Sequence, residues 1–283
     1  MIRTFAELDL DSNLLDAIEE MGFERPTKVQ AEAIPQALDG RDILASAPTG
    51  TGKTAAFVLP ALQYLQDFPR RKPGPARILI LTPTRELAMQ VADQARALAK
   101  NTKLNIFTIT GGVQYQEHAD ILGTTQDIVV ATPGRLMEYI EAERFDCRAI
   151  EWLILDEADR MLDMGFIRDI RKILNLLPKQ RQNLMFSATF SPEIKELAHD
   201  IVNNPVEVSV SPENATAHTV EQWVIGVDKK SKTAALIDLI KTNNWFQVLV
   251  FSRTKHGANR LVVQLDKAGI TAAAIHGNKS QGA

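Results

Sequence analysis

Two short motifs, each directly after an apolar run, constrain this chain more than any other feature of its sequence. The first is the glycine-rich stretch Ala47-Pro48-Thr49-Gly50-Thr51-Gly52-Lys53-Thr54, and the second is the acidic tetrad Asp156-Glu157-Ala158-Asp159. A glycine-rich turn that runs into a helix presents backbone amides and a helix dipole to anions. A carboxylate at the tip of a buried strand can coordinate a divalent cation. Together the two motifs predict a nucleoside triphosphate site on an α/β sheet.

The glycine-rich motif departs from the strict phosphate-loop pattern at one position, because Ala47 stands where the first glycine is expected. An apolar run, Asp42–Ser46, precedes it and a helical pattern, Thr54–Leu65, follows it. This context argues against a chance Gly/Lys/Thr loop. We expect Lys53 to reach the β- and γ-phosphates and the Thr54 hydroxyl to bind Mg²⁺.

The acidic tetrad follows the run Trp152-Leu153-Ile154-Leu155. We expect Asp156 to hold Mg²⁺ and Glu157 to orient and deprotonate the attacking water. Asp159 is expected to pair with a residue of a neighbouring motif instead of with the metal. The alternative is an acidic helix N-terminus, which the helix dipole favours in any case. The phosphate loop earlier in the chain makes the catalytic interpretation the stronger one.

Short apolar runs alternate with longer helical patterns, which predicts βαβ units and a parallel sheet with helices on both faces. Helices are predicted at Thr84–Lys100, Gly134–Ala142 and Pro192–Ile201, the last two with a proline in the first turn. The predicted strands are Asp42–Ser46, Ala76–Leu81, Leu104–Ile109, Asp127–Ala131, Trp152–Asp156, Asn183–Ser187 and Val206–Val210.

A polar segment, 211–218, predicts a linker between a first domain, 1–210, and a second, 219–283. Residues 219–283 carry nine Lys and Arg against four Asp and Glu, whereas the whole chain has a net charge of −3. The βα pattern restarts after the linker. The predicted strands are Val220–Val227, Gln247–Ser252 and Thr271–Ile275, and the predicted helices are Lys230–Thr242 and Lys255–Ala268. This is too little for a closed sheet, so we expect the second domain to be truncated.

The composition is that of a globular protein, with 45% hydrophobic and 24% charged residues among 283. No apolar run approaches the roughly 20 residues of a membrane span, and the first residues lack a signal-peptide core. Cys147 is the one cysteine, which excludes an intramolecular disulfide and suits a reducing compartment. These features predict a cytoplasmic protein without a membrane partner.

Further motifs in order along the chain resemble those of the DEAD-box RNA helicases, whose name is the tetrad at 156–159. Phe5 and the stretch Gly22-Phe23-Glu24-Arg25-Pro26-Thr27-Lys28-Val29-Gln30 resemble the adenine-reading Q motif of that family. The later matches are Pro83-Thr84-Arg85-Glu86-Leu87, Gly111-Gly112, Thr132-Pro133-Gly134-Arg135, Ser187-Ala188-Thr189 and Val250-Phe251-Ser252-Arg253-Thr254. The resemblance covers essentially the whole chain. It implies a RecA-like sheet followed by part of a second RecA-like domain.

The resemblance also implies roles for these residues. ATP and Mg²⁺ are the implied cofactors, with Phe5, Arg25, Gln30 and loop 47–54 around the nucleotide. Gln30 can pair with adenine N6 and N7, and Phe5 could stack on the purine or pack as an ordinary apolar staple. Asp159, Ser187 and Thr189 would couple hydrolysis to strand separation. The implied RNA-backbone contacts are Pro83, Thr84, Arg85, Gly111, Gly112, Thr132, Pro133, Gly134, Arg135 and Thr254.

We therefore expect a monomeric, ATP-dependent RNA helicase that binds RNA through its backbone, without sequence preference. The chain ends before the late arginine motifs of the family, which predicts weak or absent hydrolysis and no unwinding by this chain. Two alternatives stay open: an RNA-binding module that uses the nucleotide without turnover, and another P-loop motor such as a DNA helicase. Ribosome assembly or RNA turnover is the pathway that the family implies.

Overall fold

The structure is a computed structural model that describes residues 2–111, 124–210 and 221–278. Its chain divides into two compact units, Met1–Ala215 and Thr216–Ala283. The division falls within segment 211–218, where the sequence predicts a linker, and the residues of that segment lie outside the described ones.

The first unit is built on one seven-stranded sheet in which all paired strands are parallel. All seven strands predicted from the sequence are present, and each lies within two residues of its predicted ends. The strands are β1 (Ile43–Ser46), β2 (Ile78–Leu81), β3 (Ile106–Ile109), β4 (Ile128–Ala131), β5 (Trp152–Leu155), β6 (Gln182–Ser187) and β7 (Val206–Ser209). Their order across the sheet is β3-β4-β2-β5-β6-β1-β7.

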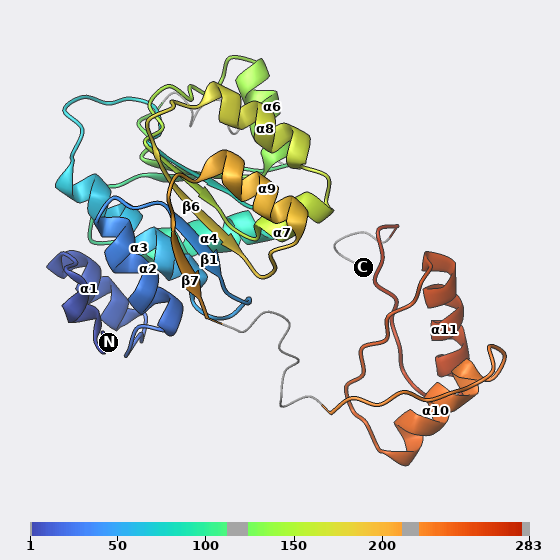
Figure 1. Ribbon diagram of the computed structural model, residues 1–283. Helices are drawn as coiled ribbons and strands as arrows, with labels where there is room; N and C mark the ends of the chain where they lie inside the picture. Colours follow the sequence, from blue (N-terminus) through green and yellow to red (C-terminus); the bar gives the residue numbers. More distant parts are fainter. Residues whose placement is uncertain (1, 112–123, 211–220, 279–283) are drawn as a thin grey trace. The chain divides into compact units, whose positions relative to one another are not determined.

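Helices surround this sheet (Figure 1). They are η1 (Phe5–Leu8), α1 (Ser12–Glu20), α2 (Lys28–Leu38), α3 (Lys53–Asp67), α4 (Arg85–Leu98), α6 (Pro133–Glu141), α7 (Ala158–Asp163), α8 (Ile167–Leu176) and α9 (Pro192–Ile201). The helices predicted at 84–100, 134–142 and 192–201 are thereby confirmed. Among the residues that the structure describes, no helix is both long and apolar enough to cross a bilayer.

Both faces of the sheet are buried, which explains why its strands read as continuous apolar runs. Successive side chains of a strand point to opposite faces. In β2, Ile78 and Ile80 join the core formed with α1–α4, and Leu79 and Leu81 join the core formed with α6–α9. The result is a three-layer α/β/α domain, with α6, α8 and α9 on one side of the sheet in Figure 1.

The strand order also explains where a ligand can bind. Parallel strands end at a common edge, and open α/β sheets bind ligands beyond these carboxyl ends, where the strand order reverses. Every motif singled out in the first unit, apart from the Q motif, follows the end of a strand. Those motifs are therefore brought to one edge of the sheet.

The second unit contains α10 (Lys232–Thr242) and α11 (Lys255–Lys267), close to the predicted helices. The strand predictions for this unit are wrong: within residues 221–278 no strand is assigned, and Val220 lies outside the described residues. Strands require hydrogen-bonded neighbours, and within the described part of this unit no ladder forms. Large apolar side chains in the three segments are consequently exposed, Val224 by 98% and Ile275 by 92%.

Candidate functional site

The glycine-rich loop 47–54 joins β1 to α3 at the carboxyl edge of the sheet. Gly50 and Gly52 both have a left-handed backbone, with φ of 80° and 88°, which glycine adopts without steric cost. Gly52 caps α3, and among the described residues no side chain caps the first turn of that helix. The positive end of the α3 dipole is therefore open to an anion.

Hydrogen bonds close the rest of the loop onto the sheet. The Ala47 amide donates to the Ser187 carbonyl at the end of β6, over 3.0 Å, and Ala47 is fully buried. The Thr51 hydroxyl donates to the Pro48 carbonyl over 2.7 Å. Pro48 and Thr49 are exposed at the tip of the loop. The missing first glycine does not prevent the turn.

The Q-motif glutamine is tied to this loop. Gln30 is only 4% exposed; its Oε1 accepts from the Thr27 amide over 2.9 Å, and its Nε2 donates to the Gly52 carbonyl over 3.0 Å. A Cβ on Gly52 would lie 2.5 Å from that Nε2 and 3.0 Å from the Thr27 hydroxyl. Glycine at position 52 is thus required twice, by its backbone conformation and by the close approach of α2.

A buried pair of opposite charges links the two motifs. Lys53 Nζ lies 4.0 Å from Asp156 Oδ1, and the two side chains are 6% and 3% exposed. Neither atom has a hydrogen-bond partner among the described residues. Burial raises the pKa of the Asp156 carboxyl to about 6, while the Lys53 ammonium acts in the opposite direction. Buried polar atoms without partners are rare in proteins, and here both are of the kind that bind phosphate and a divalent cation.

Glu157 lies beside this pair and caps α7. Its backbone is left-handed, with φ 53° and ψ 54°, a conformation that is uncommon for a residue other than glycine. Its side chain is 11% exposed, and Oε2 accepts from Arg160 Nη1 over 3.1 Å. Thr54, the second residue of α3, is half-buried.

The last residue of the tetrad reaches the neighbouring strand end. Asp159 Oδ2 accepts from both the amide and the hydroxyl of Thr189, over 3.0 and 2.9 Å. The Asp159 amide donates to Ser187 Oγ over 3.2 Å, and that hydroxyl donates to the Thr189 carbonyl over 2.8 Å. This is the pairing with a neighbouring motif that the sequence predicts for Asp159.

The two aromatic side chains of the Q motif, Phe5 and Phe23, stack on each other. Phe5 is only 6% exposed and belongs to the apolar core, and its ring stacks 6.4 Å from that of Phe23. Phe23 is half-buried, and Arg25 is exposed. The packing of Phe5 is that of the apolar staple considered above. Of the two rings, Phe23 is the more accessible.

The residues expected to contact RNA follow three adjacent strands, β3, β4 and β2. Thr84 caps α4 by accepting from the Leu87 amide over 3.2 Å, with Pro83 before it and Arg85 as the first helical residue. Gly111 follows β3 and is exposed, whereas Gly112 lies outside the described residues.

The segment after β4 lies between the other two segments expected to contact RNA, because β4 is the middle strand of β3, β4 and β2. Thr132 precedes α6, Pro133 is its first residue, and Arg135 contacts Glu138 and the ring of Tyr139. A Cβ on Gly134 would contact Phe166 at 3.6 Å. Thr254 belongs to the second unit, where it caps α11 by accepting from the Gly257 amide over 3.0 Å.

The motifs therefore form two groups along the carboxyl edge of the sheet. The ends of β5, β6 and β1 carry the tetrad, the Ser-Ala-Thr motif and the glycine-rich loop, and the ends of β3, β4 and β2 carry the second group. The strands β2 and β5 are paired, so the two groups adjoin.

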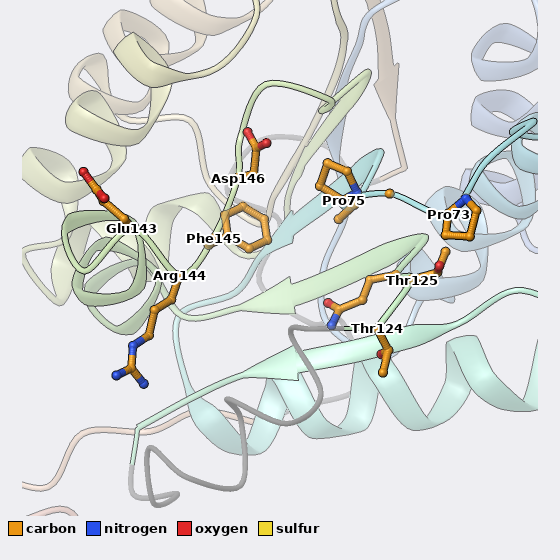
Figure 2. Close-up of a pocket in the computed structure, with 11 residues that line it drawn as sticks. Pro73, Pro75, Thr124, Thr125, Glu143, Arg144, Phe145 and Asp146 are labelled. Carbon is orange, nitrogen blue, oxygen red and sulfur yellow. The ribbon is translucent and has the colours of Figure 1, made fainter.

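A hollow of about 370 Å³ lies at the other end of the strands (Figure 2). It is lined by residues that precede β2 and β4 and by 143–146 before β5. Figure 2 shows Arg144 and Asp146 pointing in different directions from Phe145. We assign no part of the site to this hollow.

Two features were missed by sequence reasoning. One is the role of Phe23 as the accessible ring, which depends on the packing of Phe5 against it. The other is the ion pair between Arg160 and Glu157. The spacing of three residues on a helix was a signal that could have indicated that pair.

Comparisons with known proteins agree with this geometry. The profile of the DEAD/DEAH box helicase family matches residues 27–197. The chain is 54% identical over 283 residues to the ATP-dependent RNA helicase SrmB of Escherichia coli (strain K12); the match covers 99% of the chain and 64% of that protein. It is 42% identical to the ATP-dependent rRNA helicase rrp3 of Aspergillus terreus, covering 99% of the chain and 62% of that protein. The chain thus spans less than two thirds of the length of these relatives.

Solved structures show the same relationship. A DEAD box protein from the hyperthermophile Methanococcus jannaschii matches with a TM-score of 0.69 and 38% identity, over 99% of this chain and 74% of that one. An ATP-dependent RNA helicase from Sulfolobus tokodaii, described as hypothetical, matches with a TM-score of 0.66 and 36% identity, over 71% of this chain and 57% of that one. The parallel sheet and its surrounding helices are thus those of RecA-like helicase domains.

Proposed function

The chain belongs to the DEAD/DEAH box helicase family, and from this premise we propose that it binds ATP and RNA and takes part in ATP-driven separation of short RNA duplexes. The observation that carries the proposal is the buried pair of Lys53 and Asp156. Both side chains reach the edge where the glycine-rich loop meets the acidic tetrad, and the atoms Lys53 Nζ and Asp156 Oδ1 lack a hydrogen-bond partner among the described residues. A triphosphate and its cation would satisfy both atoms.

In this proposal the loop 47–54 holds the phosphates through its amides and the open end of α3. Lys53 contacts the β- and γ-phosphates. Asp156 and the Thr54 hydroxyl would hold Mg²⁺, because this cation prefers oxygen ligands such as carboxylate and hydroxyl groups. When bound, the cation would neutralise charge that develops between the β- and γ-phosphates. The unpartnered Asp156 Oδ1 supports this assignment.

Glu157 is proposed as the residue that orients the attacking water and accepts its proton. Gln30 is proposed to read adenine, since its amide retains one lone pair on Oε1 and one hydrogen on Nε2 beyond its bonds to Thr27 and Gly52. Phe23 is proposed to provide the aromatic surface beside the purine, with Phe5 supporting it from behind. Arg25 completes the group of residues around the nucleotide.

RNA is proposed to lie along the ends of β3, β4 and β2. The donors are the amides and hydroxyls at the N-termini of α4 and α6, together with the Arg85 and Arg135 guanidinium groups. Pro83, Gly111, Pro133 and Gly134 would shape the backbone at this surface. Gly112, outside the described residues, and Thr254, in the second unit, are proposed as further RNA contacts. Such contacts read the sugar–phosphate backbone, so affinity should fall steeply with salt concentration.

The link from Asp159 to Ser187 and Thr189, which ties the end of β5 to the end of β6, is proposed to couple ATP hydrolysis to strand separation. We also propose a first domain of 1–210, a linker of 211–218 and a second domain that begins at 219. The name of the Aspergillus relative favours ribosomal RNA as the substrate class. We further propose that the protein acts as a monomer in the cytoplasm.

The test measures RNA-stimulated phosphate release and ATP-analogue binding by the intact protein. Lys53→Ala should abolish analogue binding, and Glu157→Gln should retain binding while release falls by about 10²-fold or more, the contribution typical of general acid–base catalysis. Lys172→Ala is the matched control, because that lysine is 62% exposed on α8. Normal release by both active-site variants would refute the proposal. Tight binding with release that RNA does not stimulate would favour the alternative of a binding module without turnover.

A further inference from the structure

We infer that Arg160 is a positioning residue for hydrolysis, which holds the Glu157 carboxylate in the orientation that the attacking water needs. Arg160 lies outside all the motifs considered above. Its Nη1 donates to Glu157 Oε2 over 3.1 Å. The inference rests on the proposed function, in which Glu157 orients the water.

The backbone explains why this pair forms. Glu157 caps α7 in a left-handed conformation, and Arg160 follows three residues later, on the same side of the first turn. The Arg160 amide donates to Asp159 Oδ1 over 3.1 Å, and Asp159 Oδ2 is bound to Thr189. The start of α7 is therefore held from two sides, and the Arg160 side chain projects from a fixed turn.

The electrostatics explain why a cation is needed at this point. The Glu157 side chain is 11% exposed and is adjacent in sequence to Asp156, whose side chain is 3% exposed. Two carboxylates at close range repel each other, and Lys53 is paired with Asp156. The Arg160 guanidinium gives Glu157 its own counter-charge and prevents it from competing for Lys53.

The pair leaves one carboxylate oxygen for chemistry. With Oε2 engaged by Arg160, Oε1 is the oxygen that accepts a proton from the water. The water oxygen then forms its bond to the γ-phosphorus as the bond from that phosphorus to the ADP oxygen breaks. Arg160 touches neither the water nor the phosphate in this scheme and acts through Glu157 alone.

The size of the effect follows from exposure. The Arg160 side chain is 57% exposed, and a pair of this kind contributes at most about 1 kcal/mol. Removing Arg160 should therefore leave the fold intact and lower kcat by about two-fold to five-fold. The upper value of about five-fold corresponds to about 1 kcal/mol in activation free energy.

The experiment compares Arg160→Ala, Arg160→Lys and wild type in the intact protein, with saturating RNA and varied ATP. We expect Arg160→Ala to lower kcat without changing KM for ATP, and Arg160→Lys to recover at least half of the loss because it retains the charge. Arg171→Ala is the control, since that arginine is 48% exposed and pairs with Glu196 and Asp200 on α9. A wild-type kcat for Arg160→Ala, or a loss confined to KM, would overturn the inference.

Glu157→Gln in the same assay separates this inference from the proposed function. If Glu157→Gln hydrolyses ATP normally, Glu157 is not the base and the inference fails, whereas the proposed function fails only if Lys53→Ala is normal as well. If Glu157→Gln is inactive while Arg160→Ala is normal, the inference alone fails. Single-turnover rates of the double variant should equal those of Glu157→Gln, because Arg160 acts only through that carboxylate.

Discussion

Replacing Gly52 with alanine tests the contact that ties the Q motif to the phosphate loop. The new Cβ would lie 2.5 Å from Gln30 Nε2, so the Gln30 side chain would have to move and its hydrogen bond to the Gly52 carbonyl would be lost. The residue would also keep a φ of 88°, which alanine adopts only with strain.

The two contributions can be estimated separately. The left-handed backbone costs alanine about 1–2 kcal/mol. The lost hydrogen bond costs about 1 kcal/mol. Gly52→Ala should therefore lower the free energy of unfolding by about 2–3 kcal/mol, which corresponds to a fall in Tm of about 4–12 °C for a domain of this size.

Gly50→Ala provides a matched control within the same loop. Gly50 has a φ of 80°, but a Cβ there would have no neighbour within 4 Å. It should therefore show the backbone cost alone, about 1–2 kcal/mol. The difference between the two variants reports the contacts of position 52 with Gln30 and Thr27.

Urea denaturation followed by circular dichroism gives both free energies, and binding of a fluorescent ATP analogue reports the loop itself. In a Gln30→Ala background, Gly52→Ala should cost less than it does in the wild-type background, because the colliding amide is gone and only the Thr27 side chain still lies close to the new Cβ. Equal destabilisation by Gly50→Ala and Gly52→Ala in the wild-type background would refute the reasoning, since it would show that the approach of Gln30 makes no difference.

Three further predictions concern other parts of the first unit. Asp159→Ala should leave ATP-analogue binding unchanged but reduce the RNA stimulation of phosphate release, because it frees both donors of Thr189; equal stimulation would exclude a coupling role. Burial raises the pKa of the Cys147 thiol from 9.0 to about 11, so labelling by a thiol reagent at pH 8 should be slow until urea is added. The folded state holds the thiol proton of Cys147 more tightly than the unfolded state does. The stability that Cys147 contributes is therefore fully present below pH 9 and is lost as the pH rises from about 9 to 11. Arg77→Met should lower the free energy of unfolding by about 2–3 kcal/mol, because it removes a charge-assisted pair with Glu151, and urea melts would measure it; an unchanged melt would contradict this.

Local sequence patterns were sufficient to predict most helices and strands of the first unit. Strands such as β2 and β5 are apolar along their whole length, and a strand buried on both faces leaves that signature regardless of its neighbours. The same patterns were misleading at residues 247–252. An apolar run there is not assigned as a strand, because a strand exists only when another strand pairs with it, and sequence periodicity does not report the partner.

Candidate residues were also found more readily than their contacts. The chemistry proposed for Lys53, Asp156 and Glu157 follows from residue type and from position after a strand. The roles of Phe5 and Phe23 do not, because which ring is accessible depends on the packing of one against the other. Arg160 was passed over for a similar reason, since a single arginine on a helix surface is ordinary until its partner is known.

Residue types and local patterns were enough to predict an α/β sheet, a glycine-rich loop after its first strand, an acidic strand end and the motifs of the family. Those properties depend on residues close together in the chain. Only the tertiary structure decided that β5, β6 and β1 stand side by side, so that Lys53 meets Asp156 and Gln30 reaches the Gly52 carbonyl. These contacts join residues that are far apart in sequence, and their geometry depends on strand order and on packing across the sheet, which no local pattern encodes.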